Sequence, residues 1–311
     1  MTVRVPRVRV DGVLLLDKPV GLSSNAALQR ARRLLNAAKA GHTGTLDPLA
    51  SGLLPLCFGE ATKFAQALLD ARKEYLATVA FGRSTSTGDA EGAVTGEAPV
   101  AFAPDALAAT LRTFLGASQQ VPPRFAALKF QGRNLYEYAR EGIDVPRPAR
   151  PIDIDVLELV RYEPCTAVLR IRCSKGTYIR ALVEDVAAAL GTLAHLAGLR
   201  RLASGAFRVE DAITLEALEA IAPGQRSGCL LPVDAPLTSM ASVTLDAESA
   251  QSVLHGRAAR NPTSATGRLR AYDDAGRFLG LVEASDSVLR ALRLVDTAAL
   301  REGVPPPASP A

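Results

Sequence analysis

The segment 41–48 (GHTGTLDP) gathers the side chains best suited to chemistry: a histidine, two hydroxyls and a carboxylate between glycines. Pro48 disfavours the helical region for the residue before it, so Asp47 is expected on a constrained turn. A carboxylate held in this way can act as a nucleophile toward a substrate carbon. Taken by itself, however, an Asp-Pro pair is better explained as a helix N-cap followed by proline at the first helical position.

Other kinds of chemistry are disfavoured by the residues that the chain lacks. The loop has no Gly-Lys-Ser/Thr ending, so it does not match a phosphate-binding loop, and no dinucleotide-binding fingerprint follows a strand. The three histidines, His42, His195 and His255, lack the spacing of metal ligands, and the last two are expected on helices without a special role. The four cysteines show no C-x-x-C spacing, and Cys57 and Cys173 are expected to be small buried hydrophobes. We therefore expect no metal and no cofactor.

The elements around this loop are predicted from apolar spacing and cap residues. We expect a buried strand over 12–17, and then a helix capped by Ser23 or Ser24 that runs to about residue 36. Tyr75 lies in a segment of period two, which predicts a strand over 73–81 with Tyr75 on its buried face. Further predicted elements are helices over 60–71, 104–115 and 178–190, and a hairpin of strands over 152–162 and 166–173. Since strands and helices do not alternate strictly, the pattern indicates an α+β fold.

Residues 118–150 combine prolines with aromatic and basic residues. This composition predicts an extended excursion from the sheet with a short helix near 134–141. Basic residues outnumber acidic ones over 124–150 and again over 161–208, although the formal net charge of the whole chain is only +4. A polyanion partner and an ordinary solvated face explain this charge equally well.

The chain of 311 residues is long enough for two domains. Composition changes after the prolines at 232–236, and the rest shows a strand over 242–245, a helix over 247–255, a hairpin around 273–276 and a last strand over 290–295. We expect domains over 1–237 and 238–300, the second small and β-rich, and a disordered tail over 301–311. No apolar run is long enough for a membrane span or a signal peptide, so we expect a cytoplasmic protein.

Five segments together resemble the successive motifs of the TruB family of pseudouridine synthases. They are 12–24 (GVLLLDKPVGLSS), 41–55 (GHTGTLDPLASGLLP), 59–64 (GEATKF), 73–75 (KEY) and 174–180 (SKGTYIR). Each segment alone is weak, but their combination in this order is specific and covers nearly the whole chain. The resemblance implies a mixed, largely antiparallel sheet with flanking helices and a small PUA-like RNA-binding domain at the C-terminus. It also implies an enzyme that isomerises uridine 55 in the T-loop of tRNA to pseudouridine.

The resemblance assigns roles to individual residues. Asp47 matches the catalytic nucleophile, Tyr75 a tyrosine that stacks on the target base and takes part in proton transfer, and Arg180 an arginine that pairs with the carboxylate. Residues that match contacts to the bound nucleotide are His42, Tyr75, Tyr178 and Leu199. The excursion 118–150 is similar to an insertion that clamps the RNA, and the basic residues expected to contact RNA are Lys18, Lys129, Arg133, Arg140 and Lys175. One position departs from the family, because Ser86 stands where an aspartate is usual.

This reaction suits a site without metal or redox groups. The bond between uracil N1 and C1′ breaks, the base turns, and C5 bonds to C1′, so that nothing is added or removed. Asp47 could attack the sugar or assist an elimination at C2′, and the residues leave both routes open. A stacked uridine must also be flipped out of the RNA first.

Two other readings remain, a non-catalytic RNA-binding protein or tRNA chaperone, and the guide-RNA-dependent catalytic subunit of an H/ACA-type particle. The excursion 118–150 disfavours the second, because a stand-alone enzyme needs its own RNA clamp. We therefore expect a monomer that binds the T-arm of tRNA without guide RNA, protein partner or membrane.

Overall fold

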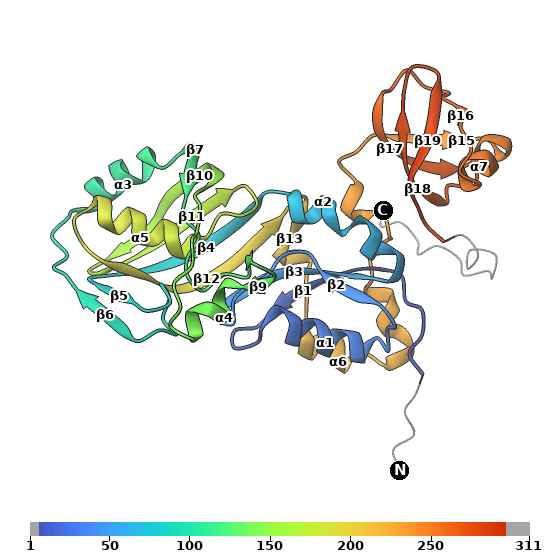
Figure 1. The fold of residues 1–311 in the computed structure, drawn as a ribbon. Coiled ribbons are helices and arrows are strands. Elements are labelled where there is room, and N and C mark those ends of the chain that lie inside the picture. The colour runs from blue at the N-terminus through green and yellow to red at the C-terminus, as the bar shows by residue number, and fades with distance from the viewer. Residues whose placement is uncertain (1–5, 297–311) are drawn as a thin grey trace, which may run out of the picture.

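The computed structural model describes residues 6–296. Its main feature is a long twisted sheet of ten strands within these residues, in the order β14-β1-β3-β12-β4-β11-β10-β7, with β2 beside β3 and β13 beside β12 (Figure 1). The pairs β1–β14 and β3–β12 are parallel and the other pairs are antiparallel. The strands are β1 Gly12–Lys18, β2 Ala40–His42, β3 Ala50–Phe58, β4 Lys73–Phe81, β7 Gly116–Gln120, β10 Arg150–Glu163, β11 Thr166–Cys173, β12 Ala194–Ser204, β13 Phe207–Arg208 and β14 Ile213–Thr214. The expected mixed, largely antiparallel sheet is confirmed.

Helices flank this sheet at both ends, which confirms the α+β class. Figure 1 shows α1 (Ser24–Leu34) and α6 (Leu215–Ala220) side by side at one end, and α3 (Pro104–Thr113) and α5 (Ile179–Ala189) at the other. Helix α1 begins where the sequence predicts, since the Ser23 hydroxyl accepts a hydrogen bond from the Ala26 amide. The segment expected to be one helix over 60–71 is instead a 3₁₀ helix, η1 (Gly59–Phe64), followed by the short α2 (Ala65–Asp70).

Two central strands were not predicted from the sequence. Strand β3 is buried along almost its whole length, but it contains Gly52 and Pro55, residues that count against a strand. Strand β12 contains His195, so the expectation that this histidine lies on a helix is wrong. Both strands are held by partners that are distant in sequence. Strand β12 pairs with β4 and β3, and strand β3 also pairs with β1. Local propensity does not reveal such pairing.

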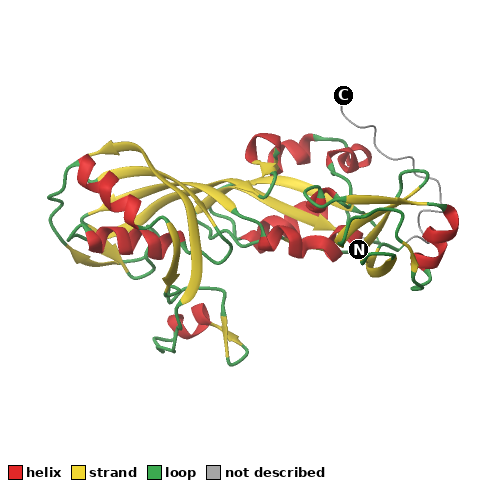
Figure 2. Cartoon of the chain, turned by 90° about the horizontal axis from the view of Figure 1, so that it is seen from above, coloured by secondary structure: helices red, strands yellow, loops and turns green. Residues whose placement is uncertain are grey.

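The excursion projects from the sheet as a small lobe, visible at the bottom of Figure 2. Residues 118–120 still belong to β7, and residue 150 begins β10, so the part outside the sheet is 121–149. We call 121–149 the insertion. It holds a short hairpin, β8 (Lys129–Phe130) and β9 (Arg133–Asn134), and then α4 (Leu135–Arg140), close to the helix that was expected near 134–141.

A second, β-rich unit follows the linking 3₁₀ helices η3 (Pro223–Cys229) and η4 (Ala235–Leu237). Its sheet has the order β15-β17-β18-β19-β16 and carries its own apolar core, apart from the large sheet in Figure 1. Its elements are β15 Ser242–Leu245, α7 Ala247–Leu254, β16 Ala259–Arg260, β17 Gly267–Asp273, β18 Phe278–Ala284 and β19 Val288–Leu294. Over residues 6–296, no helix has the length and apolarity needed to cross a membrane. The tail expected over 301–311 lies outside the described residues.

Candidate active site

Asp47 lies on a turn between β2 and β3 that hydrogen bonds to Ser24 hold in place. The Ser24 hydroxyl accepts a hydrogen bond from the Leu46 amide at 2.7 Å and donates one to the Leu46 carbonyl at 3.0 Å. The Asp47 carbonyl accepts from the Ala50 amide at 3.0 Å. No helix follows Pro48, because the chain enters β3 at Ala50, so the N-cap interpretation of Asp47 is wrong. The Asp47 side chain is 42% exposed, which leaves its carboxylate accessible to a substrate.

Arg180, in the first turn of α5, directs its guanidinium at this carboxylate. Its Nη2 lies 3.1 Å from Asp47 Oδ2, and the Arg180 side chain is only 7% exposed. The same Nη2 donates to the Phe125 carbonyl in the insertion at 2.7 Å, and Nη1 donates to the Thr87 carbonyl at 2.8 Å. These bonds hold the guanidinium in one orientation and link the carboxylate to the insertion.

A second carboxylate, Asp89, shares this guanidinium and was missed by the sequence analysis. Its Oδ2 lies 3.6 Å from Arg180 Nε, and its side chain is 5% exposed. Asp89 accepts hydrogen bonds from the Thr87 hydroxyl at 2.5 Å and from the Glu91 amide at 3.1 Å. Ser86, the position of the departure from the family, is exposed on the same loop. The carboxylate that Arg180 meets on this loop is thus present despite the serine.

Tyr75 lies on β4 with its side chain turned into the core, 9% exposed. Burial raises the pKa of its phenol, the nearby Arg201 guanidinium opposes this rise, and the Asp47 carboxylate adds to it. At neutral pH the phenol is therefore protonated and can donate a hydrogen bond.

The three other residues expected to contact the nucleotide come from three different strands and helices. His42 ends β2, and its Nδ1 is buried without a hydrogen-bond partner, while burial and then the Arg201 charge lower the pKa of its imidazole. Tyr178 precedes α5, where the Gln120 side chain bonds both its amide (2.8 Å) and its carbonyl (3.1 Å). Leu199 lies on β12, paired with Ala50 and Ala77. A neutral imidazole with a free ring nitrogen is suited to bind a polar ligand group.

The cations expected to contact RNA differ in their surroundings. Lys18 is fully buried, and its ammonium donates to the carbonyls of Pro19 (2.8 Å) and Leu22 (2.6 Å). Burial lowers the pKa of Lys18 to about 8, and the Asp47 carboxylate opposes this shift. Lys18 therefore does not belong with the surface cations, because its ammonium is already bound inside the fold.

The remaining four cations are at the surface. Lys129 is exposed, and Lys175 forms an exposed ion pair with Asp70 at 2.7 Å. The Arg140 guanidinium lies 5.3 Å from the centre of the Tyr136 ring. Arg133 is bound by the carboxylates of Glu137 and Glu141. The insertion thus presents aromatic rings together with positive charge, although the charge of Arg133 is partly compensated.

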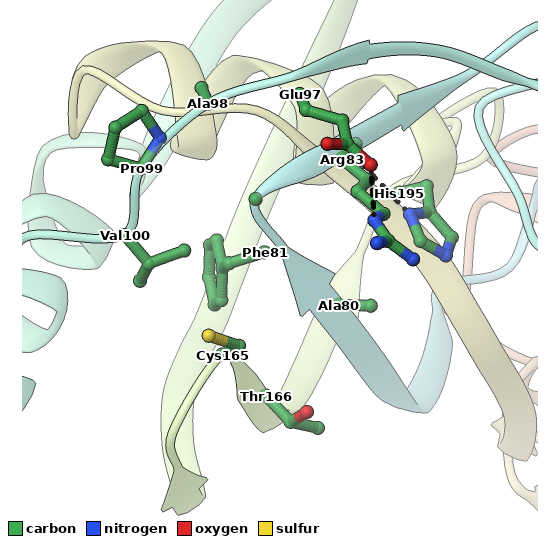
Figure 3. A pocket seen from close by; sticks show the side chains of 11 residues that line it. Ala80, Phe81, Arg83, Glu97, Ala98, Pro99, Val100, Cys165, Thr166 and His195 are labelled. Carbon is green, nitrogen blue, oxygen red and sulfur yellow. Dashed lines mark hydrogen bonds and ion pairs between the residues drawn. The ribbon is translucent and has the colours of Figure 1, made fainter.

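Two cavities lie away from this site. One of about 680 Å³ is lined by Phe81, Val100, Cys165 and His195 among others, near the end of β4 (Figure 3). His195 is satisfied there, because its Nδ1 lies 3.0 Å from the Arg83 carbonyl. The described residues include no cluster of three or more His, Cys, Asp or Glu side chains that could hold a metal ion.

Comparison with known proteins covers almost the whole chain. The family model described as TruB family pseudouridylate synthase (N terminal domain) matches residues 32–179, that of the tRNA pseudouridylate synthase B C-terminal domain matches 180–238, and that of pseudouridine synthase II TruB, C-terminal, matches 241–295. The tRNA pseudouridine synthase B of Azoarcus sp. (strain BH72) is 53% identical over 294 residues, 94% of this chain and 98% of the relative. That of Aromatoleum aromaticum is 54% identical over 291 residues, 93% of this chain and 94% of the relative.

Solved structures show the same architecture at lower identity. A structure of a Cbf5-Nop10-Gar1 complex matches with a TM-score of 0.69 at 26% identity, over 91% of this chain and 84% of that chain. An H/ACA RNP bound to a substrate RNA containing 2′-deoxyuridine matches with a TM-score of 0.68 at 25% identity, over 91% and 84%.

Proposed function

Because this chain belongs to the TruB family of pseudouridylate synthases, we propose that it isomerises uridine 55 in the T-loop of tRNA to pseudouridine, with Asp47 as the nucleophile. The observation that carries this proposal is the pairing of an accessible Asp47 with the buried guanidinium of Arg180, which hydrogen bonds to Thr87 and Phe125 hold in one orientation. Two relatives more than half identical to this chain, both named for tRNA, support the substrate class.

The covalent route uses the site as follows. Asp47 bonds to C1′ while the N1–C1′ bond breaks and its electron pair stays on the uracil. The base turns, C5 attacks C1′, and the carboxylate leaves. The proton on C5 is then lost to a base and N1 is protonated, so the atoms balance without any cofactor. Arg180 orients the Asp47 carboxylate, and Tyr75 stacks on the base and exchanges protons. In the elimination route, Asp47 instead removes a proton from C2′.

We propose that different parts of the protein bind the flipped nucleotide and the rest of the tRNA. Flipping the uridine costs a few kcal/mol, which stacking and phosphate contacts repay. His42, Tyr178 and Leu199 are proposed to line the pocket of the flipped nucleotide. The insertion, within the stretch 118–150, is proposed to clamp the T-arm through Lys129, Arg133 and Arg140, with Lys175 nearby. We propose a catalytic domain over 1–237 and a PUA-like RNA-binding domain over 238–300, acting as a monomer in the cytoplasm.

One experiment tests the proposal directly. Purified protein is incubated with unmodified tRNA transcript, without guide RNA, and pseudouridine is mapped by position. Wild-type protein should modify position 55, and Asp47→Asn should lower the rate at least about 1,000-fold, because it removes the group that supports the sugar. Asp105→Asn, an exposed aspartate in the first turn of α3, is the matched control and should retain full activity.

The same experiment separates the competing functions. A non-catalytic RNA-binding protein would form no pseudouridine, and Asp47→Asn would change nothing. A guide-dependent enzyme would act only after guide RNA is added. Normal activity of Asp47→Asn would disprove the assignment of the nucleophile.

A further inference from the structure

Arg201, on β12, is among the largest side chains that are fully buried, with 1% exposure. Across residues 6–296 its guanidinium forms no ion pair with a carboxylate. Its partners are backbone carbonyls: Nε donates to Leu53 at 2.6 Å and Nη2 to Gly44 at 3.3 Å. A buried charge without a counter-ion is costly, so a guanidinium kept in this position calls for a functional explanation.

The position of Arg201 links the parts of the active site. On β12 it pairs with Tyr75 of β4 on one side and with Gly52 of β3 on the other. Side chains directly opposite on neighbouring strands share one face of the sheet, so Arg201 and Tyr75 are neighbours. Gly44 belongs to the loop that carries Asp47. The Arg201 side chain therefore reaches from the strand beside Tyr75 to the loop of the carboxylate.

Gly52 makes room for this arrangement, and Gly44 supplies a backbone conformation that it needs. A Cβ added at Gly52 would lie 2.3 Å from the Arg201 carbonyl oxygen, and Gly52 has a φ of +98°. A Cβ at Gly44 would stand 3.6 Å from Nη1, with φ at +119°. Glycine at position 52 therefore allows the backbones of β3 and β12 to approach each other, and glycine at position 44 allows the positive φ of the loop.

The charge of Arg201 also reaches the ionisable groups around the site. It opposes the rise that burial causes in the pKa of Tyr75, and it contributes to the lowered pKa of His42. These effects agree with the contacts, which place Arg201 between the loop that carries Asp47 and the strand β4 that carries Tyr75.

We propose that Arg201 is a positioning residue for the isomerisation: it ties the Gly44–Asp47 loop to β3 and β12 and so fixes the carboxylate relative to Tyr75 while the base is detached. This inference rests on the function proposed above. It predicts an effect on the chemical step, because a displacement of about 1 Å in a reacting group can cost a factor of about 100. A purely structural role would instead lower stability and leave the rate per folded molecule unchanged.

The test compares Arg201→Met and Arg201→Lys with Arg200→Met. Arg200 is the neighbour on the opposite face of β12, where it pairs with Asp17 at 2.8 Å. Three quantities are measured: the single-turnover rate of pseudouridine formation, the Kd for tRNA, and the melting temperature. We expect Arg201→Met to lower the rate about 10- to 100-fold with Kd within about threefold of wild type. Arg201→Lys keeps the charge but cannot donate to both the Leu53 and Gly44 carbonyls as the guanidinium does, so it should recover part of the rate. Arg200→Met should react at the wild-type rate.

A double-mutant cycle adds a readout that a structural role would not move. If Arg201 aligns the carboxylate with Tyr75, Arg201→Met should cost less in a Tyr75→Phe background than in wild type. Wild-type single-turnover rates in folded Arg201→Met, or a rate loss equal to that of Arg200→Met, would overturn the inference. Should Arg201→Met fail to fold, Arg201→Lys decides, since a full rate in that variant rejects a positioning role. Absence of pseudouridine with the wild-type protein would instead reject the proposed function itself.

Discussion

Several buried cations of this protein bind backbone carbonyls. Lys18 and Arg201 behave in this way, and so does Lys73, whose ammonium donates to the carbonyls of Leu68, Leu69 and Ala71 at the end of α2. Lys73 thereby joins α2 to the strand that carries Tyr75, and burial lowers its pKa to about 8. At the residue scale, these cations shape the site from inside the fold, whereas RNA phosphates require cations at the surface.

The lowered pKa of Lys18 has a measurable consequence for stability. Its pKa is about 8 in the folded protein against an ordinary value of 10.5. Between these two pH values the unfolded chain binds more protons at Lys18 than the folded protein does. The free energy of unfolding therefore increases as pH rises through this range. Lys18→Met lacks this contribution. From pH 8 to pH 9.5, the difference in unfolding free energy between the two proteins should move by about 1–2 kcal/mol in favour of wild type.

Urea unfolding at the two pH values measures this difference. Burial raises the pKa of the Cys57 thiol to about 12 and that of Cys173 to about 11, which lowers stability in alkali, but both proteins share these groups. A difference that does not change with pH would show that Lys18 is not held in the way described.

At the scale of elements, β3 is the strand on which the site depends. It pairs with β1 on one side and with β12 and β2 on the other, and the loop of Asp47 connects β2 to it. At Gly52 the backbones of β3 and β12 come so close that a side chain has no room. The relation between Asp47 and the residues of β12 is therefore set by backbone contact.

Gly52→Ala should be strongly destabilising. The new Cβ would meet the Arg201 backbone, and φ of +98° is strained for any residue with a Cβ. We expect a loss of about 3 kcal/mol or more in unfolding free energy. Gly41→Ala, on the adjoining β2, is the matched control, because its Cβ would meet nothing within 4 Å. Equal melting temperatures for the two variants in thermal unfolding would contradict this account.

At the scale of the whole molecule, the β-rich unit and the insertion are both attached to the unit of the large sheet. The β-rich unit meets η1 through the rings of Phe64 and Phe278, whose centres are 5.3 Å apart, and through Lys63, which donates to the Leu294 carbonyl at 3.0 Å. The insertion meets the active site through the Phe125 carbonyl, bound by Arg180. The rest of the insertion projects away from the sheet (Figure 2).

The cations of the insertion should contribute unequally to RNA binding. Lys129 and Arg140 are free to replace counter-ions on phosphates, whereas Arg133 must first leave Glu137 and Glu141. Lys129→Ala and Arg140→Ala should each reduce the slope of log K against log salt by about 1, and Arg133→Ala should reduce it by less. Filter binding of tRNA over a range of salt measures the slopes, with Arg112→Ala on α3 as control. Identical slopes in all four variants would argue against RNA contacts by the insertion.

The sequence by itself determined the local features of this protein. Pro48 predicts the constrained turn of Asp47, Ser23 the start of α1, and the alternation around Tyr75 the strand β4. The successive motifs identify the family, and the family models confirm it. These features follow from neighbouring residues, whose spacing sets backbone conformation directly.

Only the tertiary structure decided which groups meet. Asp89 forms an ion pair with Arg180, although the sequence assigned no role to it. Arg201 reaches Gly44 because β12 pairs with both β3 and β4. Likewise, the burial of Lys18 follows from how the turns after β1 close around it. Such contacts depend on strand register and on burial between segments far apart in sequence, which local patterns do not encode.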